Sequence, residues 1–209
     1  MRSKEKLLEG SGLCVIIDMD ILARDRALYI TRAAVKAGAD MIQLRSKGLD
    51  TVEALKTAKA IRRITLHKAA FIVNDRLEVA VASDSDGIHI GLGDIDIKLA
   101  KKLLGQRKIV GVSASGFKKA LSAKNEGASY LGVGPVFKTP IKRGKRPCGI
   151  GLLENIRKLK LPVFLIGGIN ERNIQKLTAK GFKRVAVIRA VIAANDPFQA
   201  VCRLKKALI

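Results

Sequence analysis

The chain has 209 residues, enough for one domain to bury a full core without disulfides or a structural metal. Hydrophobic residues make up 48% and aromatic residues only 4%, which argues for an aliphatic core and against disorder or a coiled coil. Lys and Arg total 40 against 18 Asp and Glu, a formal net charge of +22. Such a charge predicts an anionic partner: nucleic acid, a membrane surface or phosphorylated small molecules.

The cysteines and the N-terminal stretch predict a cytoplasmic protein. Cys14, Cys148 and Cys202 are far apart in the sequence, so we expect neither a disulfide framework nor a zinc site. The apolar stretch at residues 13–17 ends at Asp18 and is too short for a signal peptide or a membrane span. We therefore expect a soluble protein with no membrane partner, and the sequence leaves open whether it forms a homo-oligomer.

Eight short apolar runs alternate with helix-like stretches along the chain. These runs are typical of buried parallel strands and begin at Leu13, Met41, Ala69, Gly87, Lys108, Tyr130, Pro162 and Arg184. Asp50 with Glu53 indicates a capped helix start, as does Asp196 with the proline that follows it. Eight strand–helix units predict an α/β fold, a single (β/α)8 TIM barrel over residues 1–209, with residues 1–12 as an N-terminal extension or helix.

Polar residues and glycines follow every one of these runs, at the end of a barrel where active sites lie. They are Asp18, Gln43, Arg45, Lys47, Asn74, Asp75, Asp94, Ser113, Gly134, Thr139, Lys142, Gly167, Gly168, Ile188 and Arg189. Loops between core strands are polar in any case, so ordinary loops remain the alternative interpretation. The pattern favours one shared active-site face.

Two of these carboxylates are candidate metal ligands. Asp75 and Asp94 follow adjacent strands, and Mg²⁺ prefers oxygen ligands, usually one or two carboxylates together with waters and substrate phosphates. Aspartate is also a favoured helix N-cap. Spacing alone does not choose between metal binding and helix capping.

Cationic and amide side chains converge after the second run. Gln43, Arg45 and Lys47 alternate along an extended segment, so all three point to one face. Two cations and an amide suit an anionic leaving group. Gln43 and Arg45 would also need a polar partner if the strand is buried, and we favour a ligand in that role.

Glycines at the ends of the sixth and seventh runs leave room for a ligand. Gly167 and Gly168 precede a helix that we expect to begin near Asn170, an arrangement that lets backbone N–H groups approach an anion. Barrels commonly bind phosphate in the loops after strands seven and eight. Gly132 and Gly134 similarly allow a ligand to lie close over the sixth strand.

The two histidines give no sign of nucleophilic catalysis. We interpret His67 as an exposed helix residue and His89 as a hydrogen-bonded core histidine. No Ser-His-Asp or Cys-His set stands out.

Seven motifs occur in a fixed order between Met41 and Pro197, and the resemblance that they carry extends from about Leu13 to Asp196. They read MIQLRSKG, FIVNDRLEVA, DGIHIGLGD, IVGVSA, YLGVGPVFKT, PVFLIGGIN and VAVIRAVIAANDP. In this order they resemble the thiamine-phosphate synthase family. The resemblance implies a Mg²⁺-dependent transferase of thiamine biosynthesis that joins hydroxymethylpyrimidine diphosphate to hydroxyethylthiazole phosphate and releases pyrophosphate. It also implies that the diphosphate leaves before the thiazole nitrogen attacks, a route that needs charge stabilisation rather than a nucleophile.

The same resemblance implies roles for individual residues. The pyrimidine diphosphate would be held by Gln43, Leu44, Arg45, Ser46, Lys47 and Asn74. Mg²⁺ would be bound by Asp75 and Asp94. The substrate-binding set would be completed by Ser113 and Lys142 on the diphosphate, and by Thr139, Pro140, Ile141, Gly168, Ile188 and Arg189 around the thiazole phosphate. The catalytic residues would be Arg45, Lys47, Ser113 and Lys142.

Two positions depart from the family pattern, and two other functions compete. Ile141 stands where a hydroxyl is usual, and Arg189 replaces a common Ser, although a guanidinium offers a phosphate two donors. A thiazole tautomerase-like paralogue is disfavoured because Asn74, Asp75 and Asp94 together suit a diphosphate and a metal. A basic nucleic-acid-binding protein is disfavoured because no aromatic platform accompanies the basic residues, so we expect no specific nucleic acid.

Overall fold

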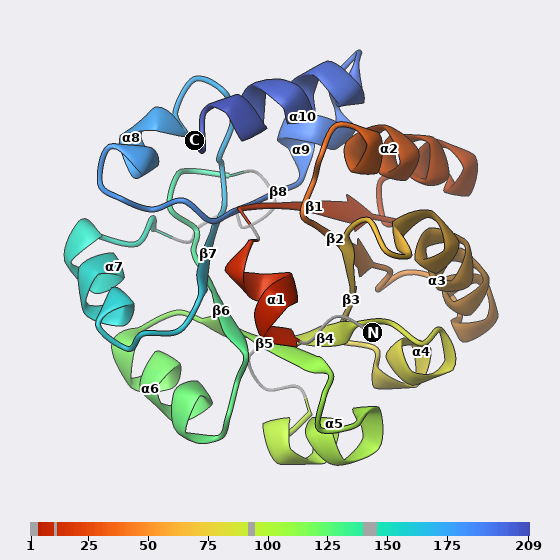
Figure 1. Cartoon of the computed structure of the whole chain (residues 1–209), viewed down its shortest axis with the longest axis horizontal. Coiled ribbons are helices and arrows are strands. Elements are labelled where there is room, and N and C mark those ends of the chain that lie inside the picture. The colour runs from red at the N-terminus through yellow and green to blue at the C-terminus, as the bar shows by residue number, and fades with distance from the viewer. Residues whose placement is uncertain (1–3, 11, 92–94, 140–145) are drawn as a thin grey trace.

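Eight parallel strands close into one barrel in the computed structural model of the chain (Figure 1). The structure describes residues 4–10, 12–91, 95–139 and 146–209. The strands are β1 (Leu13–Asp18), β2 (Met41–Arg45), β3 (Ala70–Asn74), β4 (Gly87–Ile90), β5 (Ile109–Ala114), β6 (Tyr130–Val133), β7 (Val163–Ile166) and β8 (Val185–Val187). Their order around the barrel follows the chain, and β1 pairs with β8. The predicted (β/α)8 fold is confirmed.

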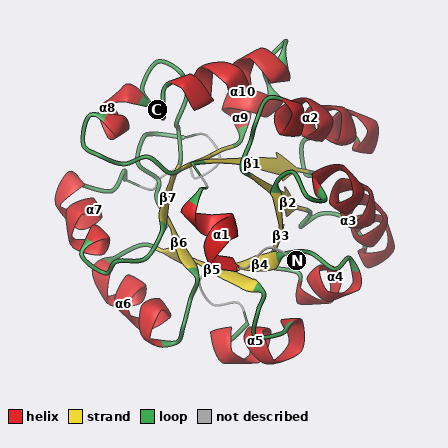
Figure 2. Cartoon of the chain, viewed as in Figure 1, coloured by secondary structure: helices red, strands yellow, loops and turns green. Residues whose placement is uncertain are grey.

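Helices surround this barrel (Figure 2). They are α2 (Arg24–Lys36), α3 (Thr51–Thr65), α4 (Leu77–Ala82), α5 (Ile97–Leu104), α6 (Phe117–Asn125), α7 (Ile150–Arg157), α8 (Gln175–Thr178), α9 (Arg189–Ile192) and α10 (Pro197–Lys206). No helix within the described ranges is both long and apolar enough to cross a membrane.

Helix starts follow the sequence signals at two of three places. The Asp50 and Asp196 side chains accept the N–H groups three residues ahead of them, as predicted. The helix expected near Asn170 is wrong in its start. Asn170 Oδ1 accepts the N–H of Arg172 within a turn, and α8 begins only at Gln175.

A short helix covers one end of the barrel instead of its side. Figure 1 shows α1 (Lys4–Glu9) in front of the ring of strands. Its Leu8 is buried with residues near the strand starts, such as Cys14 and Met41. The end of the barrel where the strands begin is therefore closed, which leaves the opposite end for a ligand.

Side chains along each strand alternate between two buried clusters. The inner cluster fills the barrel and contains Leu8, Cys14, Ile16, Met41, Ala70, Ile72, Ile109, Tyr130, Phe164 and Ala186. The intervening residues, such as Val15 and Ile42, pack against the helices. Burial on both faces explains why the strands read as continuous apolar runs.

Two glycines make room for the large rings inside the barrel. A Cβ on Gly111 would lie 2.1 Å from Cζ of Tyr130, and a Cβ on Gly132 would lie 2.8 Å from Cε1 of His89. A Cβ on Gly134 would lie 2.0 Å from the carbonyl oxygen of Ile166, which therefore occupies the space beside this glycine. The prediction that Gly132 and Gly134 leave space for a ligand is therefore wrong, because protein atoms fill it.

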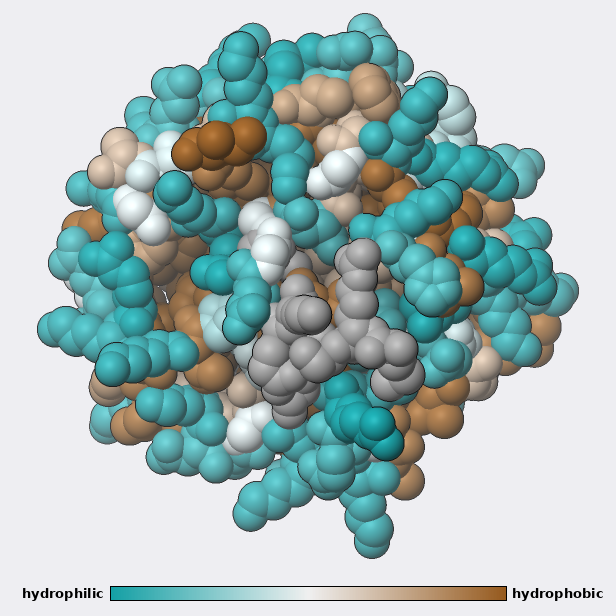
Figure 3. All heavy atoms as spheres, viewed as in Figure 1, coloured by the Kyte–Doolittle hydropathy of each residue, from teal (hydrophilic) through white to brown (hydrophobic). Residues whose placement is uncertain are grey.

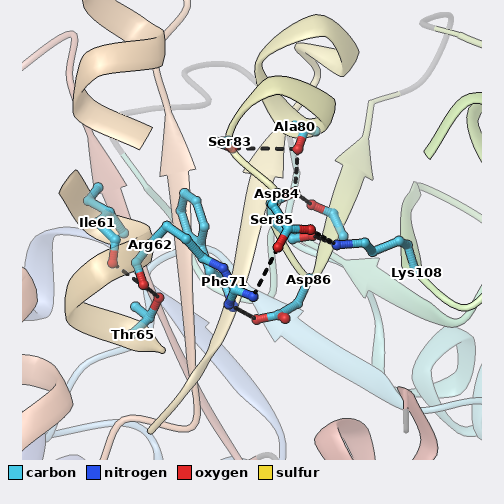
Figure 4. A network of polar contacts seen from close by, with 11 residues as sticks. Ile61, Arg62, Thr65, Phe71, Ala80, Ser83, Asp84, Ser85, Asp86 and Lys108 are labelled. Atoms are coloured by element: carbon cyan, nitrogen blue, oxygen red, sulfur yellow. Dashed lines mark hydrogen bonds and ion pairs between the residues drawn. The ribbon is translucent and has the colours of Figure 1, made fainter. Parts of the chain in front are cut away.

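Charged residues at the closed end pair with one another (Figure 4). Asp86 accepts hydrogen bonds from Arg62 at 3.1 Å and from the N–H of Phe71 at 2.8 Å. Lys108 donates to Asp84, and this hydrogen bond lowers the pKa of the Asp84 carboxyl. Figure 3 shows that hydrophilic side chains cover most of this face. Arg62 and Lys108 therefore hold the strand starts together rather than forming an open anion site.

The glycine at position 111 provides a test of the inner packing. We expect Gly111→Ala to lower the free energy of unfolding by about 3 kcal/mol or more, because its methyl overlaps the Tyr130 ring. Urea unfolding measures this change. Gly151→Ala in α7 is the control, because its added methyl would meet nothing within 4 Å, and the higher helix propensity of alanine should leave stability unchanged or raise it by up to about 1 kcal/mol. Equal stability of the two variants would contradict this packing.

Candidate active site at the carboxyl ends of the strands

The polar residues predicted from the strand ends gather at the open end of the barrel. Asp18 pairs in register with Arg45, Asn74 with His89, and Ser113 with Gly132. Four predicted site residues lie outside the described residues, namely Asp94, Pro140, Ile141 and Lys142.

Arg45 is held by two carboxylates of the β1 end. Its Nη1 lies 2.7 Å from Asp18 Oδ1 and 2.5 Å from Asp20 Oδ2. Burial disfavours the charged guanidinium, but these hydrogen bonds outweigh that effect and raise the pKa of Arg45. The polar partner that burial demands thus comes from the protein itself, which differs from the ligand predicted for that role. Arg45 serves first to join β1 to β2 at the rim.

Asp20 also anchors the loop after β2. Its Oδ1 accepts the N–H of Gly48 at 2.9 Å. Burial alone would raise the pKa of Asp20, yet the hydrogen bonds from Gly48 and Arg45 outweigh it and hold this pKa below its ordinary value. This arrangement fixes the loop that carries Lys47.

Lys47 and Asp75 form an ion pair across the ends of β2 and β3. Lys47 Nζ lies 2.9 Å from Asp75 Oδ2, and Asp75 Oδ1 accepts the N–H of Gly91 at 3.1 Å. The Lys47 side chain is 54% exposed and that of Asp75 only 15%. A half-buried carboxylate with an exposed ammonium beside it can bind an anion through the cation, or a metal through the carboxylate.

Helix capping does not account for Asp75, and Asp94 lies outside the described residues. The N-cap of α4 is Arg76, so Asp75 is not the cap of that helix. The N-cap of α5 is Asp96, whose side chain accepts the N–H of Leu99. The capping alternative that the sequence left open is therefore wrong for Asp75, and the cap of the helix after β4 is not Asp94. Within the described residues no group of three or more His, Cys, Asp or Glu side chains could hold a metal.

The other predicted residues of the second strand point in different directions. Leu44 packs in the outer cluster under the helices, so its side chain faces away from the barrel interior. Ser46 is almost fully buried, and its hydroxyl has no hydrogen-bond partner in the part of the chain that the structure describes. Gln43 is buried inside the barrel, where its side chain hydrogen-bonds the Tyr130 side chain.

A cavity of about 250 Å³ lies among the loops after β6, β7 and β8. It brings together the four described residues that the family resemblance places around a phosphate: Thr139, Gly168, Ile188 and Arg189. Lys138 and Asn170 also line it. Residue-by-residue transfer missed Lys138, although its place directly before Thr139 in a basic loop could have indicated it.

Close packing of two loops shapes this cavity. Gly167 and Gly168 have φ values of +102° and +67°, which side-chain-bearing residues rarely adopt. A Cβ on Gly168 would lie 2.4 Å from the carbonyl oxygen of Lys138. The N–H of Phe137 also donates to the carbonyl oxygen of Gly167 at 3.0 Å. These glycines therefore let the β6 loop lie directly against the β7 loop, and the cavity forms beside this contact.

A parallel barrel with a cavity among the loops after β6 to β8 has the layout in which TIM barrels frequently bind phosphate. The sequence matches the thiamine monophosphate synthase family over residues 13–191. The chain belongs to this family.

Individual relatives agree with this assignment. A thiamine-phosphate synthase of Prochlorococcus marinus (strain AS9601) is 38% identical to this chain over 99% of its residues. The match covers only 58% of the length of that relative, so this chain spans little more than half of it. A thiamine-phosphate synthase of Methanosarcina barkeri is 39% identical over 92% of this chain and 88% of its own length. The solved structure named thiamine phosphate pyrophosphorylase from Pyrococcus furiosus superposes with a TM-score of 0.86 at 36% identity, covering 98% of this chain and 96% of that one.

The low pKa of Asp20 makes a prediction about pH. Its contribution to stability is complete above the unfolded-state pKa near 3.9 and is lost as the pH falls through the lower folded-state value. We expect Asp20→Asn to destabilise the protein by about 1 kcal/mol at pH 7 and by less at pH 3, measured by urea unfolding. Exposed Glu154 provides the control, since Glu154→Gln should show no such trend. A pH-independent effect of Asp20→Asn would contradict the pairing.

Proposed function

We propose that the chain is a thiamine-phosphate synthase, joining hydroxymethylpyrimidine diphosphate to hydroxyethylthiazole phosphate. Family membership supports this proposal. The observation that carries it is the division of the barrel end into two anion-compatible regions. Lys47 and Ser113 lie at the ends of β2 and β5, and the cavity with Thr139 and Arg189 lies among the loops after β6 to β8. A reaction between a diphosphate and a monophosphate needs two such regions.

The proposed reaction requires stabilisation of the leaving charge. The carbon–oxygen bond to the diphosphate breaks, its electron pair leaves with pyrophosphate, and the thiazole nitrogen then donates a pair to the resulting pyrimidinylmethyl cation. Lys47 would neutralise charge on the departing oxygens and Ser113 would donate a hydrogen bond to them, together with Lys142. Gln43 and Asn74 would orient the pyrimidine, so that the two reacting atoms are held close.

The described residues fit a magnesium ion in one respect. The Asp75 carboxylate is a hard oxygen donor and already attracts the Lys47 ammonium at 2.9 Å. Mg²⁺ commonly takes one or two carboxylates and fills its remaining positions with waters and substrate phosphates. We propose Asp75, with Asp94, as its protein ligands. Bound there, the ion would supply positive charge to the diphosphate.

The first test is turnover with both substrates. We expect release of pyrophosphate and a product with the mass of thiamine phosphate, both abolished by a chelator and restored by Mg²⁺. Lys47→Ala should lower kcat about 100- to 1,000-fold, because one preorganised donor to the leaving group is lost. Lys102→Ala, on the exposed side of α5, is the control and should leave kcat unchanged. Turnover that persists in chelator, or no thiamine phosphate at all, would contradict the proposal.

The second test concerns the loop cavity and Arg189. We expect Arg189→Ala to raise the KM for the thiazole phosphate about tenfold with a smaller change in the KM for the pyrimidine diphosphate, because one phosphate contact is lost. Arg32→Ala on α2 is the exposed control. An unchanged thiazole KM would remove Arg189 from the phosphate site.

The proposed partners and location follow from the chemistry. Phosphorylated small molecules are the expected partners. A cytoplasmic location is part of the proposal, and the three cysteines, all free thiols, agree with a reducing compartment.

A further inference from the structure

A chain of four polar side chains crosses the inside of the barrel below the proposed diphosphate site. His89 on β4 is only 8% exposed, and both of its ring nitrogens have partners. Nδ1 lies 2.9 Å from the Tyr130 hydroxyl, and Nε2 lies 3.0 Å from Ser113 Oγ. The Tyr130 side chain in turn hydrogen-bonds Gln43. The chain therefore joins β2, β6, β4 and β5 and ends at a residue that faces the open end.

We propose that His89 is a positioning residue whose Nε2–H donates to Ser113 Oγ, so that the Ser113 hydroxyl proton is left to donate to an anionic phosphoryl oxygen. The identity of that anion rests on the function proposed above. The direction of the hydrogen bonds does not.

The direction of this hydrogen bond depends on the hydroxyl group of Ser113. Ser113 has one proton to donate, whereas a phosphoryl oxygen can only accept. If Ser113 donated to His89 Nε2, its lone pairs would face the anion and repel it. Only a protonated Nε2 leaves the Ser113 proton available. The direction of this one hydrogen bond therefore decides whether Ser113 binds or repels an anion.

The other end of the chain favours the same direction. Burial raises the pKa of Tyr130 well above its ordinary value, so its hydroxyl keeps its proton and can donate to Nδ1. The acceptor nearest to this hydroxyl in the chain is Nδ1, at 2.9 Å. With Nδ1 accepting, the neutral ring carries its proton on Nε2. Tyr130 and His89 thus each point a donor along the chain toward Ser113.

The packing around His89 leaves little room for another ring orientation. Gly132 leaves the space that the imidazole fills, and the His89 and Tyr130 ring centroids lie 5.5 Å apart. Burial of the imidazole requires hydrogen-bond partners for its ring nitrogens. Here both nitrogens are used, one of them on a proposed substrate-binding residue.

Nitrogen NMR tests the direction without any assay of activity. The chain has two histidines, so ¹⁵N-histidine labelling gives two ring systems, and His67→Gln removes one of them. We expect His89 to carry a proton on Nε2 in the unliganded protein, and Tyr130→Phe to reduce the fraction protonated there. An unprotonated Nε2 in the wild-type protein would overturn the proposal.

Matched variants test the effect on Ser113. A Gln amide reaches the position of Nε2, whereas an Asn amide reaches only that of Nδ1. We expect His89→Gln to keep kcat within about tenfold and His89→Asn to lower it about 100-fold, with a smaller change in KM. In a Ser113→Ala background, His89→Asn should cost less than about threefold, because the two residues act as one unit. Equal losses from His89→Asn with and without Ser113 would overturn the positioning role.

The two measurements separate this inference from the proposed function. A wild-type protein that makes no thiamine phosphate would remove the function, yet the NMR experiment would still decide the direction of the Ser113 hydrogen bond. Thermal unfolding of the His89 variants identifies any that fail to fold. If a His89 variant fails to fold, the spectrum of the wild-type protein alone still decides the direction of the hydrogen bond between His89 and Ser113.

Discussion

Closure of the sheet between β1 and β8 determines which side chains lie inside the barrel and how much volume they share. Each strand turns every second residue inward, and the interior is full. Large rings therefore fit only where a neighbouring strand carries glycine, as for Tyr130 beside Gly111 and His89 beside Gly132. The polar chain that ends at Ser113 can form only because Gly111 and Gly132 leave space for the Tyr130 and His89 rings. The position of Ser113 at the open end consequently depends on the packing inside the barrel.

Some of the 40 Lys and Arg side chains are held in structural ion pairs, and the net charge of +22 belongs to the cations that remain. The charge of Arg45 is compensated by Asp18 and Asp20. Lys205 donates to Asp40, whose carboxylate also accepts the backbone N–H groups of Gly12 and Leu13 at the start of β1. Most exposed cations elsewhere lie on helix surfaces, where they are solvated and screened by salt. A few cations, Lys47 and Arg189 among them, lie at the open end, where we propose that phosphorylated ligands bind. Their position, more than the total charge, determines what the protein binds.

Sequence reasoning succeeded where a signal is local. The apolar runs mark strands because both of their faces are buried, and Asp50 marks a helix start because its cap acts three residues away. It failed where the outcome depends on neighbours across the sheet. The partners of Arg45 follow from the register of β1 on β2, and the role of His89 follows from glycines on two other strands. Periodicity within one segment contains neither piece of information.

The central claim is that the open end of the barrel holds two anions in separate places, a diphosphate near Lys47 and Ser113 and a monophosphate in the loop cavity beside Arg189. A crystal structure with Mg²⁺, pyrophosphate and thiamine phosphate tests it most directly. The account predicts pyrophosphate within hydrogen-bond distance of Ser113 Oγ, and the phosphate of thiamine phosphate among the loops after β6 to β8. Both ligands bound away from these residues, or one site taking both phosphates, would contradict it.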